Sequence, residues 1–118
     1  MKKTKILFIC FANMDRSPTA AHIYANYPDI ETKSAGTASG AVVPVHSGLI
    51  EWADVILCME DWQKLFIQTR YVDYLSGKEV GCLYISDNYE YWHPQLISMI
   101  KERMKPWLLK YGLNEMDI

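Results

Sequence analysis

The sequence has few cysteines, and they are too scattered to form a scaffold. Cys10, Cys58 and Cys82 are an odd number, lie far apart and include no Cys-x-x-Cys pair. We therefore expect neither a disulfide framework nor a zinc site. The three histidines also lack ligand-like spacing, so we predict no metal and no cofactor.

The sequence also lacks long runs of like charge and long apolar runs. Its net charge is −2 and its basic residues form no stripe, so we expect no nucleic-acid partner and no anionic membrane partner. No stretch approaches the roughly 18 apolar residues of a spanning helix. The lysines at the start precede only five apolar-like residues, which is too few for a signal-peptide core. We expect a cytoplasmic protein.

What the chain does have suits one compact domain over residues 1–118, since half of its residues are apolar and no repeat or linker interrupts it. Short apolar runs predict strands, and segments of helical spacing lie between them. The alternation favours an α/β fold with a parallel sheet. The strands are expected at Lys5–Cys10, Ile30–Ser34, Val55–Met59 and Val80–Ile85, and the helices from Ser17 to before Pro28, at Ser47–Trp52, after a cap at Asp61 and at Pro94–Tyr111.

The most informative segment is Cys10–Ser17, here called the anion loop, which follows the apolar run Ile6–Ile9. It places a cysteine, five residues, an arginine and a serine where a strand should lead into a helix. Five intervening residues can curl around one tetrahedral anion with their backbone N–H groups pointing inward. The helix start adds the positive end of its dipole. We expect inorganic phosphate or sulfate to bind there.

The side chains of the anion loop suit phosphoryl chemistry. Arg16 can hold two phosphate oxygens at once, and the same positive field favours a nucleophilic thiolate at Cys10. A cysteine that ends a buried strand is often only a small apolar residue. That reading fits Cys58 and Cys82, because only Cys10 has the arginine, the serine and the strand-loop-helix context.

A general acid is also needed, because the leaving oxygen takes up a proton as its bond to phosphorus breaks. Asp87 follows the predicted fourth strand and should share a rim with Cys10, because ligands bind beyond the carboxyl ends of parallel strands. A turn cap would also explain Asp87. Glu60, Asp61 and Glu90 are weaker candidates for the acid.

These motifs resemble the low-molecular-weight protein tyrosine phosphatases, in particular a short branch of predicted phosphatases of this type. The family opens with C-x-G-N-x-C-R-S-P, where this chain has C-F-A-N-M-D-R-S-P at residues 10–18. The similarity continues in S-A-G-T at residues 34–37, in A-D-V-I-L-C-M-E at residues 53–60, and in D-N-Y at residues 87–89, where the family usually has D-P-Y. The fold implied is flavodoxin-like, a three-layer α/β sandwich with a four-stranded parallel sheet.

The resemblance implies a phosphoric monoester hydrolase, a protein tyrosine phosphatase that cleaves aryl phosphomonoesters through a cysteinyl-phosphate. Its substrate would be a phosphotyrosine protein or a small aryl phosphate. Cys10 would be the nucleophile and Arg16 the phosphate clamp. Ser17 would donate to the Cys10 thiolate, and Asp87 would be the general acid.

The resemblance also implies residues that bind substrate or support the loop. Asn13 and Ser34 would hold the loop's shape by hydrogen bonds. Tyr89 would flank an aryl group, although its ring, like those of Tyr91 and Trp92, would equally suit packing against the last helix. The substrate-binding set is Phe11, Ala12, Asn13, Met14, Asp15 and Tyr89.

The chain departs from the family pattern at several positions. Ala12 replaces a glycine that tolerates more backbone conformations. Asp15 replaces a cysteine, and its carboxylate would oppose a phosphate dianion unless it points outward. Asn88 replaces a proline and loosens the segment that carries Asp87. The stretch from Thr37 to Asp54 is also shorter than in larger relatives.

Two other functions stay open. A non-catalytic phosphate- or phosphoprotein-binding module would fit the changes at Asp15 and Asn88. An arsenate reductase of the same fold would use the same loop and then resolve its adduct with further cysteines, for which Cys58 and Cys82 are available, although no close pair follows the loop. A phosphocarrier domain would have little need for Arg16.

Overall fold

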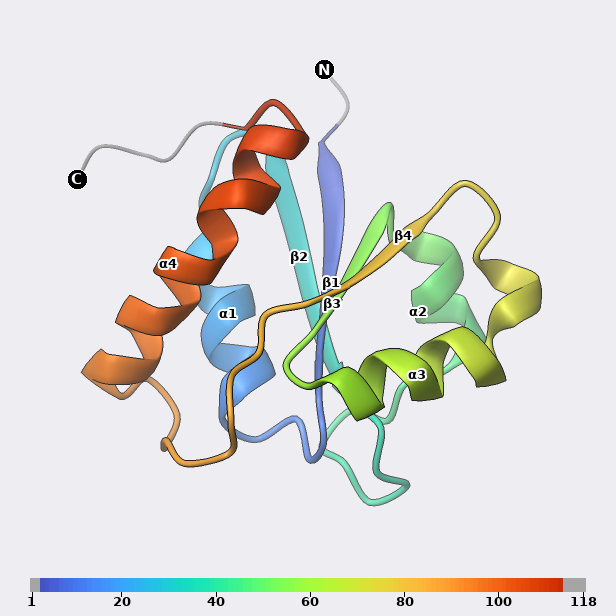
Figure 1. Cartoon of the computed structure of the whole chain (residues 1–118), viewed down its shortest axis with the longest axis horizontal. Coiled ribbons are helices and arrows are strands. Elements are labelled where there is room, and N and C mark those ends of the chain that lie inside the picture. The colour runs from blue at the N-terminus through green and yellow to red at the C-terminus, as the bar shows by residue number, and fades with distance from the viewer. Residues whose placement is uncertain (1–2, 114–118) are drawn as a thin grey trace.

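The computed structural model describes residues 3–113 and contains one parallel sheet (Figure 1). Its strands are β1 (Thr4–Cys10), β2 (Ile30–Gly36), β3 (Val55–Cys58) and β4 (Glu79–Cys82). They lie in the order β2-β1-β3-β4, and every neighbouring pair is parallel. This confirms the predicted α/β class and the four-stranded sheet.

Helices cover both faces of the sheet and complete a three-layer sandwich. Figure 1 shows α1 (Arg16–Tyr24) and α4 (Pro94–Lys110) on one side of the strands, and α2 (Ser47–Trp52) and α3 (Asp61–Arg70) on the other. A short 3-10 helix at Val72–Tyr74, which the sequence did not predict, follows α3. None of the helices that the structure describes is long and apolar enough to cross a lipid bilayer.

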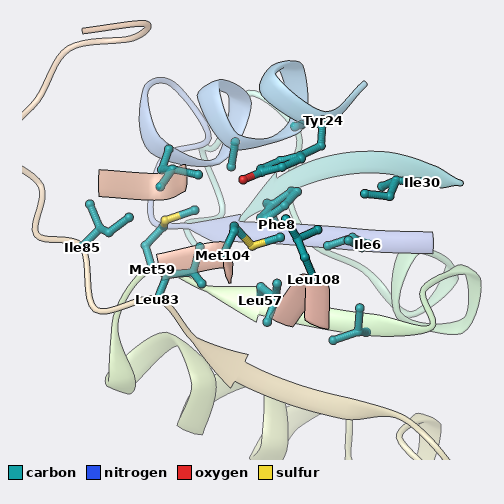
Figure 2. Close-up of a cluster of buried hydrophobic side chains, with 14 of the residues drawn as sticks. Ile6, Phe8, Tyr24, Ile30, Leu57, Met59, Leu83, Ile85, Met104 and Leu108 are labelled. Atoms are coloured by element: carbon teal, nitrogen blue, oxygen red, sulfur yellow. The ribbon is translucent and has the colours of Figure 1, made fainter. Parts of the chain in front are cut away.

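The central strands are apolar throughout because both of their faces are covered. Alternate residues of β1 point to opposite sides: Ile6 and Phe8 join the cluster beneath α1 and α4, whereas Leu7 and Ile9 join the cluster beneath α2 and α3. Figure 2 shows the first cluster, in which Phe8 stacks near Tyr24 with their ring centroids 6.3 Å apart. These two cores fix the strand ends that carry the candidate site.

Several predicted boundaries were wrong. The second strand continues past Ser34 to Gly36, because Gly36 still pairs in register with Cys10. The fourth strand ends at Cys82 instead of Ile85, where Tyr84 adopts a left-handed φ of 57° and interrupts the extended backbone. The remaining differences are small. The first strand begins at Thr4 instead of Lys5, and the third ends at Cys58 instead of Met59. The first helix begins at Arg16 instead of Ser17 and ends at Tyr24, and the last helix ends at Lys110 instead of Tyr111.

The carboxyl ends of the strands bring distant segments of the chain to one rim. The anion loop leaves β1 there, and the segment 86–93, here called the acid loop, follows β4 on the same side (Figure 1). Hydrogen bonds continue beyond β4, since the amides of Leu83 and Ile85 donate to the carbonyls of Cys58 and Met59, each at 2.8 Å. Asp87 therefore starts from a fixed point beside β3.

Candidate active site

The anion loop turns sharply at Asn13, whose φ of 56° is left-handed. Asparagine tolerates this conformation better than most residues, and its side chain is held on both sides. Its Nδ2 donates to the hydroxyls of Ser17, at 2.8 Å, and Ser34, at 3.0 Å, while its Oδ1 accepts from the amide of Val43 at 3.2 Å. The structure thus brings together the residues predicted to support the loop.

Gly36 allows β2 to approach the anion loop closely. A Cβ at this position would stand 2.4 Å from the carbonyl oxygen of Phe11 and 3.0 Å from the amide nitrogen of Asn13. Any larger residue would push the loop away from the strand end. The glycine of the S-A-G-T segment is therefore required by the shape of the anion loop itself.

Cys10 lies at the base of the anion loop with its Sγ 3.0 Å from the Ser17 Oγ. Ser17 Oγ accepts a hydrogen bond from Asn13, and its own hydrogen faces two acceptors, the sulfur at 3.0 Å and the carbonyl oxygen of Ala35 at 3.4 Å. A serine at the start of a predicted helix would suit a cap, but Ser17 does not cap α1. The N-cap is Asp15, and the Ser17 hydroxyl faces the buried sulfur instead.

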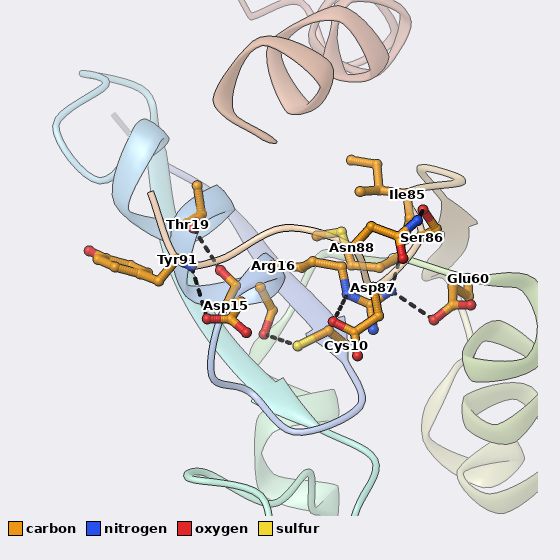
Figure 3. A network of polar contacts seen from close by, with 12 residues as sticks. Cys10, Asp15, Arg16, Thr19, Glu60, Ile85, Ser86, Asp87, Asn88 and Tyr91 are labelled. Atoms are coloured by element: carbon orange, nitrogen blue, oxygen red, sulfur yellow. Dashed lines mark hydrogen bonds and ion pairs between the residues drawn. The ribbon is translucent and has the colours of Figure 1, made fainter. Parts of the chain in front are cut away.

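Arg16 is the most unusual buried residue of the site, because its guanidinium is only 2% exposed. Its Nη1 donates to the Glu60 carboxylate at 2.7 Å and to the Ile85 carbonyl at 2.8 Å (Figure 3). These two bonds use both hydrogens of Nη1 and leave the edge formed by Nε and Nη2 for an anion. Asp87 Oδ1 stands near that edge, 3.7 Å from Nε.

Glu60 orients Arg16, and we had considered it only as a weaker acid. It is also the N-cap of α3, where we had expected Asp61. The buried Gln63 completes a capping box by accepting from the Glu60 amide at 3.0 Å. Only the glutamine at the third helical position fits the usual capping-box pattern, which has Ser, Thr, Asp or Asn at the cap itself. Nothing local indicated the bond of Glu60 to Arg16, 44 residues away.

A pocket of about 150 Å³ opens among these residues. Its lining joins the nucleophile candidate to the arginine and the acid candidate, and consists of Cys10, Ala12, Met14, Asp15, Arg16 and Asp87. Phe11 lies outside this lining, with its ring 5.8 Å from that of Trp62. Tyr89 packs against the core beneath α1 and α4, with its ring 5.9 Å from that of His93. Phe11 and Tyr89 therefore lie beside the pocket.

The Asp15 carboxylate is engaged with the acid loop. Its Oδ1 accepts from the backbone amide of Tyr91 at 2.9 Å. The charge expected to oppose a phosphate is thus partly satisfied by a hydrogen bond on the side away from Cys10 (Figure 3).

The other two cysteines lie apart from this chemistry. Cys58 is fully buried in the cluster beneath α2 and α3, on the opposite face of the sheet from Cys10. Cys82 is its register partner on β4. Burial raises the pKa of both thiols, most strongly that of Cys58. Among the residues that the structure describes, no cluster of three or more histidine, cysteine or acidic side chains is arranged to hold a metal ion.

Comparison with solved structures shows which proteins share this architecture. A low-molecular-weight protein tyrosine phosphatase from Streptococcus pyogenes aligns over 91% of this chain and 92% of its own, with a TM-score of 0.72 and 12% identity. The Drosophila arginine phosphatase aligns over 95% and 100%, with a TM-score of 0.74 and 18% identity. Vibrio vulnificus Wzb, solved with benzylphosphonate, aligns over 91% and 98%, with a TM-score of 0.72 and 21% identity.

This chain has the fold of the low-molecular-weight protein tyrosine phosphatases. The shared architecture extends over nearly the whole chain of each of these neighbours. The resemblance read from the sequence motifs is therefore confirmed at the level of the fold. No protein-family model matches the sequence, and no curated protein matches it either.

Proposed function

We propose that this protein is a phosphatase that hydrolyses aryl phosphomonoesters, with phosphotyrosine in a protein or a small aryl phosphate as its substrate. One observation carries the proposal: a sulfur held by a hydroxyl, a buried guanidinium edge and a carboxyl group meet in a single small pocket. Solved proteins of the same fold include tyrosine and arginine phosphatases, which supports phosphomonoester chemistry. Because the nucleophile must stay reduced, we propose a cytoplasmic location.

In the first step, the Cys10 thiolate attacks phosphorus and the bond from phosphorus to the aryl oxygen breaks. The phosphoryl oxygens bind the Nε and Nη2 edge of Arg16 and the backbone amides of the anion loop. Asp87 gives its proton to the departing phenolate oxygen. The products are a phenol and a cysteinyl-phosphate.

In the second step, water attacks the phosphorus of the cysteinyl-phosphate. The Asp87 carboxylate takes a proton from the water, the phosphorus–sulfur bond breaks, and inorganic phosphate leaves. Ser17 donates a hydrogen bond to the departing sulfur, which it reaches at 3.0 Å. The reaction returns Cys10 and Asp87 to their starting forms and uses no metal or organic cofactor.

The alternatives find less support in the geometry. An arsenate reductase needs a second thiol that reaches the adduct on Cys10, but Cys58 lies across the sheet and burial raises the pKa of the thiols of both Cys58 and Cys82. A pure binding module was suggested by the changes at Asp15 and Asn88, and the Asp15 carboxylate is engaged by the amide of Tyr91. Neither alternative is favoured by an observation of its own.

The proposal is tested by mixing the protein with an aryl phosphate on a rapid time scale. A burst of phenol equal to one per active site, followed by slower turnover, is expected when a covalent intermediate forms. Acid quenching should then recover phosphate on the peptide that contains Cys10. Binding of phosphate without any release of phenol would favour the binding module instead.

Asp87→Asn should slow the hydrolysis of esters with poor leaving groups by about 10²–10⁴-fold, the range of general acid catalysis. The effect should be much smaller for p-nitrophenyl phosphate, whose leaving group departs without a proton. The measurement is kcat/KM for a series of aryl phosphates, because this constant reports the step in which the phenol leaves.

Glu90→Gln is the matched control, because it neutralises an exposed carboxylate of the same loop that does not line the pocket. If Asp87→Asn lowered kcat/KM equally for every leaving group, Asp87 would have another role and the acid would have to be sought elsewhere.

A further inference from the structure

Asp15 stands at the N-cap of α1 but does not cap that helix. An aspartate in this position usually accepts a hydrogen bond from an amide in the first turn of its own helix. Here its Oδ1 accepts instead from the amide of Tyr91, 76 residues further along the chain, at 2.9 Å (Figure 3). The carboxylate therefore joins the anion loop to the acid loop.

Two further contacts hold the acid loop against α1. The fully buried Thr19 accepts from the amide of Trp92 at 2.9 Å and donates to the carbonyl of Asp15 at 2.6 Å. The ring of His22 lies 2.5 Å from the hydroxyl of Tyr91, measured from Nδ1. We call the contacts of Asp15, Thr19 and His22 with residues 91 and 92 the α1 clamp.

The backbone conformation at Trp92 indicates that the α1 clamp holds the loop under strain. Its φ of 62° is rare for a bulky aromatic residue. Such conformations persist only where the surrounding contacts determine them, and the hydrogen bond from the Trp92 amide to Thr19 is such a contact. The loop is thus drawn onto α1 at this point.

Between the fixed ends, Asp87 itself is held weakly. Ile85 is fixed by its amide bond to Met59 and by its carbonyl bond to Arg16. The side chain of Asp87 is 65% exposed. Its Oδ1 lies 3.7 Å from Arg16 Nε, which is longer than a hydrogen bond. Asn88 leaves φ free where a proline would fix it. Within the segment, Asn88 Nδ2 donates to the Ser86 hydroxyl at 2.8 Å and Tyr89 packs against the core beneath α1 and α4. The position of Asp87 therefore depends on these contacts together with the anchor at each end.

We propose that Asp15 is a positioning residue, which fixes the acid loop through the amide of Tyr91 so that Asp87 stands over the pocket. This rests on the proposed function, in which Asp87 is the general acid. The carboxylate acts through its oxygen as a hydrogen-bond acceptor, and its negative charge is incidental to that task. Asp15 then supplies the restraint that Asn88 does not.

The test compares Asp15→Ala, which removes the acceptor and the charge, with Asp15→Asn, which removes only the charge. Asp15→Ala should lower kcat/KM for phenyl phosphate about tenfold relative to kcat/KM for p-nitrophenyl phosphate, the scale of one hydrogen bond to a charged group. Asp15→Asn should keep the wild-type ratio between the two substrates while lowering KM for both. The exposed Asp73→Ala controls for the loss of one negative charge.

Combining variants separates positioning from a general loss of structure. In an Asp87→Asn background, Asp15→Ala should lower kcat/KM for phenyl phosphate by less than twofold, because the acid that it positions is already gone. Substitution of a residue that only stabilised the fold would lower kcat/KM for both substrates in both backgrounds. Hydrogen exchange of the Tyr91 and Trp92 amides should be faster in Asp15→Ala and unchanged in Asp15→Asn.

Each contrary result has a definite meaning. The positioning role is overturned if an active Asp15→Ala protein keeps the wild-type ratio between substrates, or if both Asp15 variants raise kcat/KM for both substrates, as simple charge repulsion would predict. If the wild-type protein hydrolyses neither substrate, the proposed function fails and Asp15 has no acid to position. Unchanged Tyr91 exchange in Asp15→Ala would overturn the α1 clamp whatever the activity.

Discussion

Cys10→Ser is expected to abolish hydrolysis of aryl phosphates, with a loss of at least about 10⁴-fold, while phosphate still binds in the anion loop. A covalent mechanism needs an ionised nucleophile, and a serine hydroxyl is far less acidic than a thiol. The loop itself should keep its shape, because its support comes from Asn13, Ser34 and Gly36. Steady-state turnover and a phosphate titration followed by calorimetry check both parts.

Cys58→Ala is the matched control for this prediction. That thiol is fully buried on the other face of the sheet, so its loss should lower stability modestly and leave turnover per folded molecule as it was. If Cys10→Ser remained active, the cysteinyl-phosphate route would be ruled out. If it remained active but no longer bound phosphate, the anion loop would not be part of the active site either.

Arg16→Lys is expected to lower kcat/KM by about 10²–10³-fold, the loss that follows removal of one preorganised donor from an anionic transition state. Lysine carries the same charge but has no planar edge to hold two phosphoryl oxygens. It also cannot meet Glu60 and the Ile85 carbonyl in the same way, so the bonds at 2.7 and 2.8 Å would be lost or weakened.

Arg70→Lys is the control variant. Arg70 is exposed, and its guanidinium lies 5.8 Å from the centre of the Phe66 ring. It lies on the opposite side of the sheet from α1, which carries Arg16. Thermal unfolding of both variants separates lost activity from lost structure. If Arg16→Lys matched Arg70→Lys in kcat/KM, the buried guanidinium would be a structural ion pair and no phosphate clamp.

The layered fold was predictable because its signals are local. Apolar runs marked the strands and helical spacing marked the segments between them, and the alternation of the two determined a parallel sheet. The errors lie where tertiary contacts override the local pattern. β2 extends to Gly36 because β1 offers a partner for it, and β4 stops where Tyr84 turns left-handed.

The site was predictable in part for the same reason. Cys10, Asn13, Arg16 and Ser17 occupy one short loop, and Asp87 follows a strand whose end must lie on the same rim. The roles assigned to them remain predictions until variants are measured.

The contacts that escaped prediction connect segments far apart in the sequence. Glu60 meets Arg16 across 44 residues, and Asp15 meets Tyr91 across 76. A lone carboxylate in a sequence carries no mark of the distant donor that it will meet. Asp15 therefore looked like a defect in an anion-binding loop, and only the folded chain reveals the amide that it holds.

The placement of the three thiols makes the protein convenient to quantify. All three thiols are buried, but Cys10 alone among them lines the pocket, and burial raises the pKa of Cys58 and Cys82. An anionic alkylating reagent such as iodoacetate, drawn to the same loop as phosphate, would therefore modify one sulfur per native molecule. The amount of label taken up then counts the competent molecules in a preparation directly.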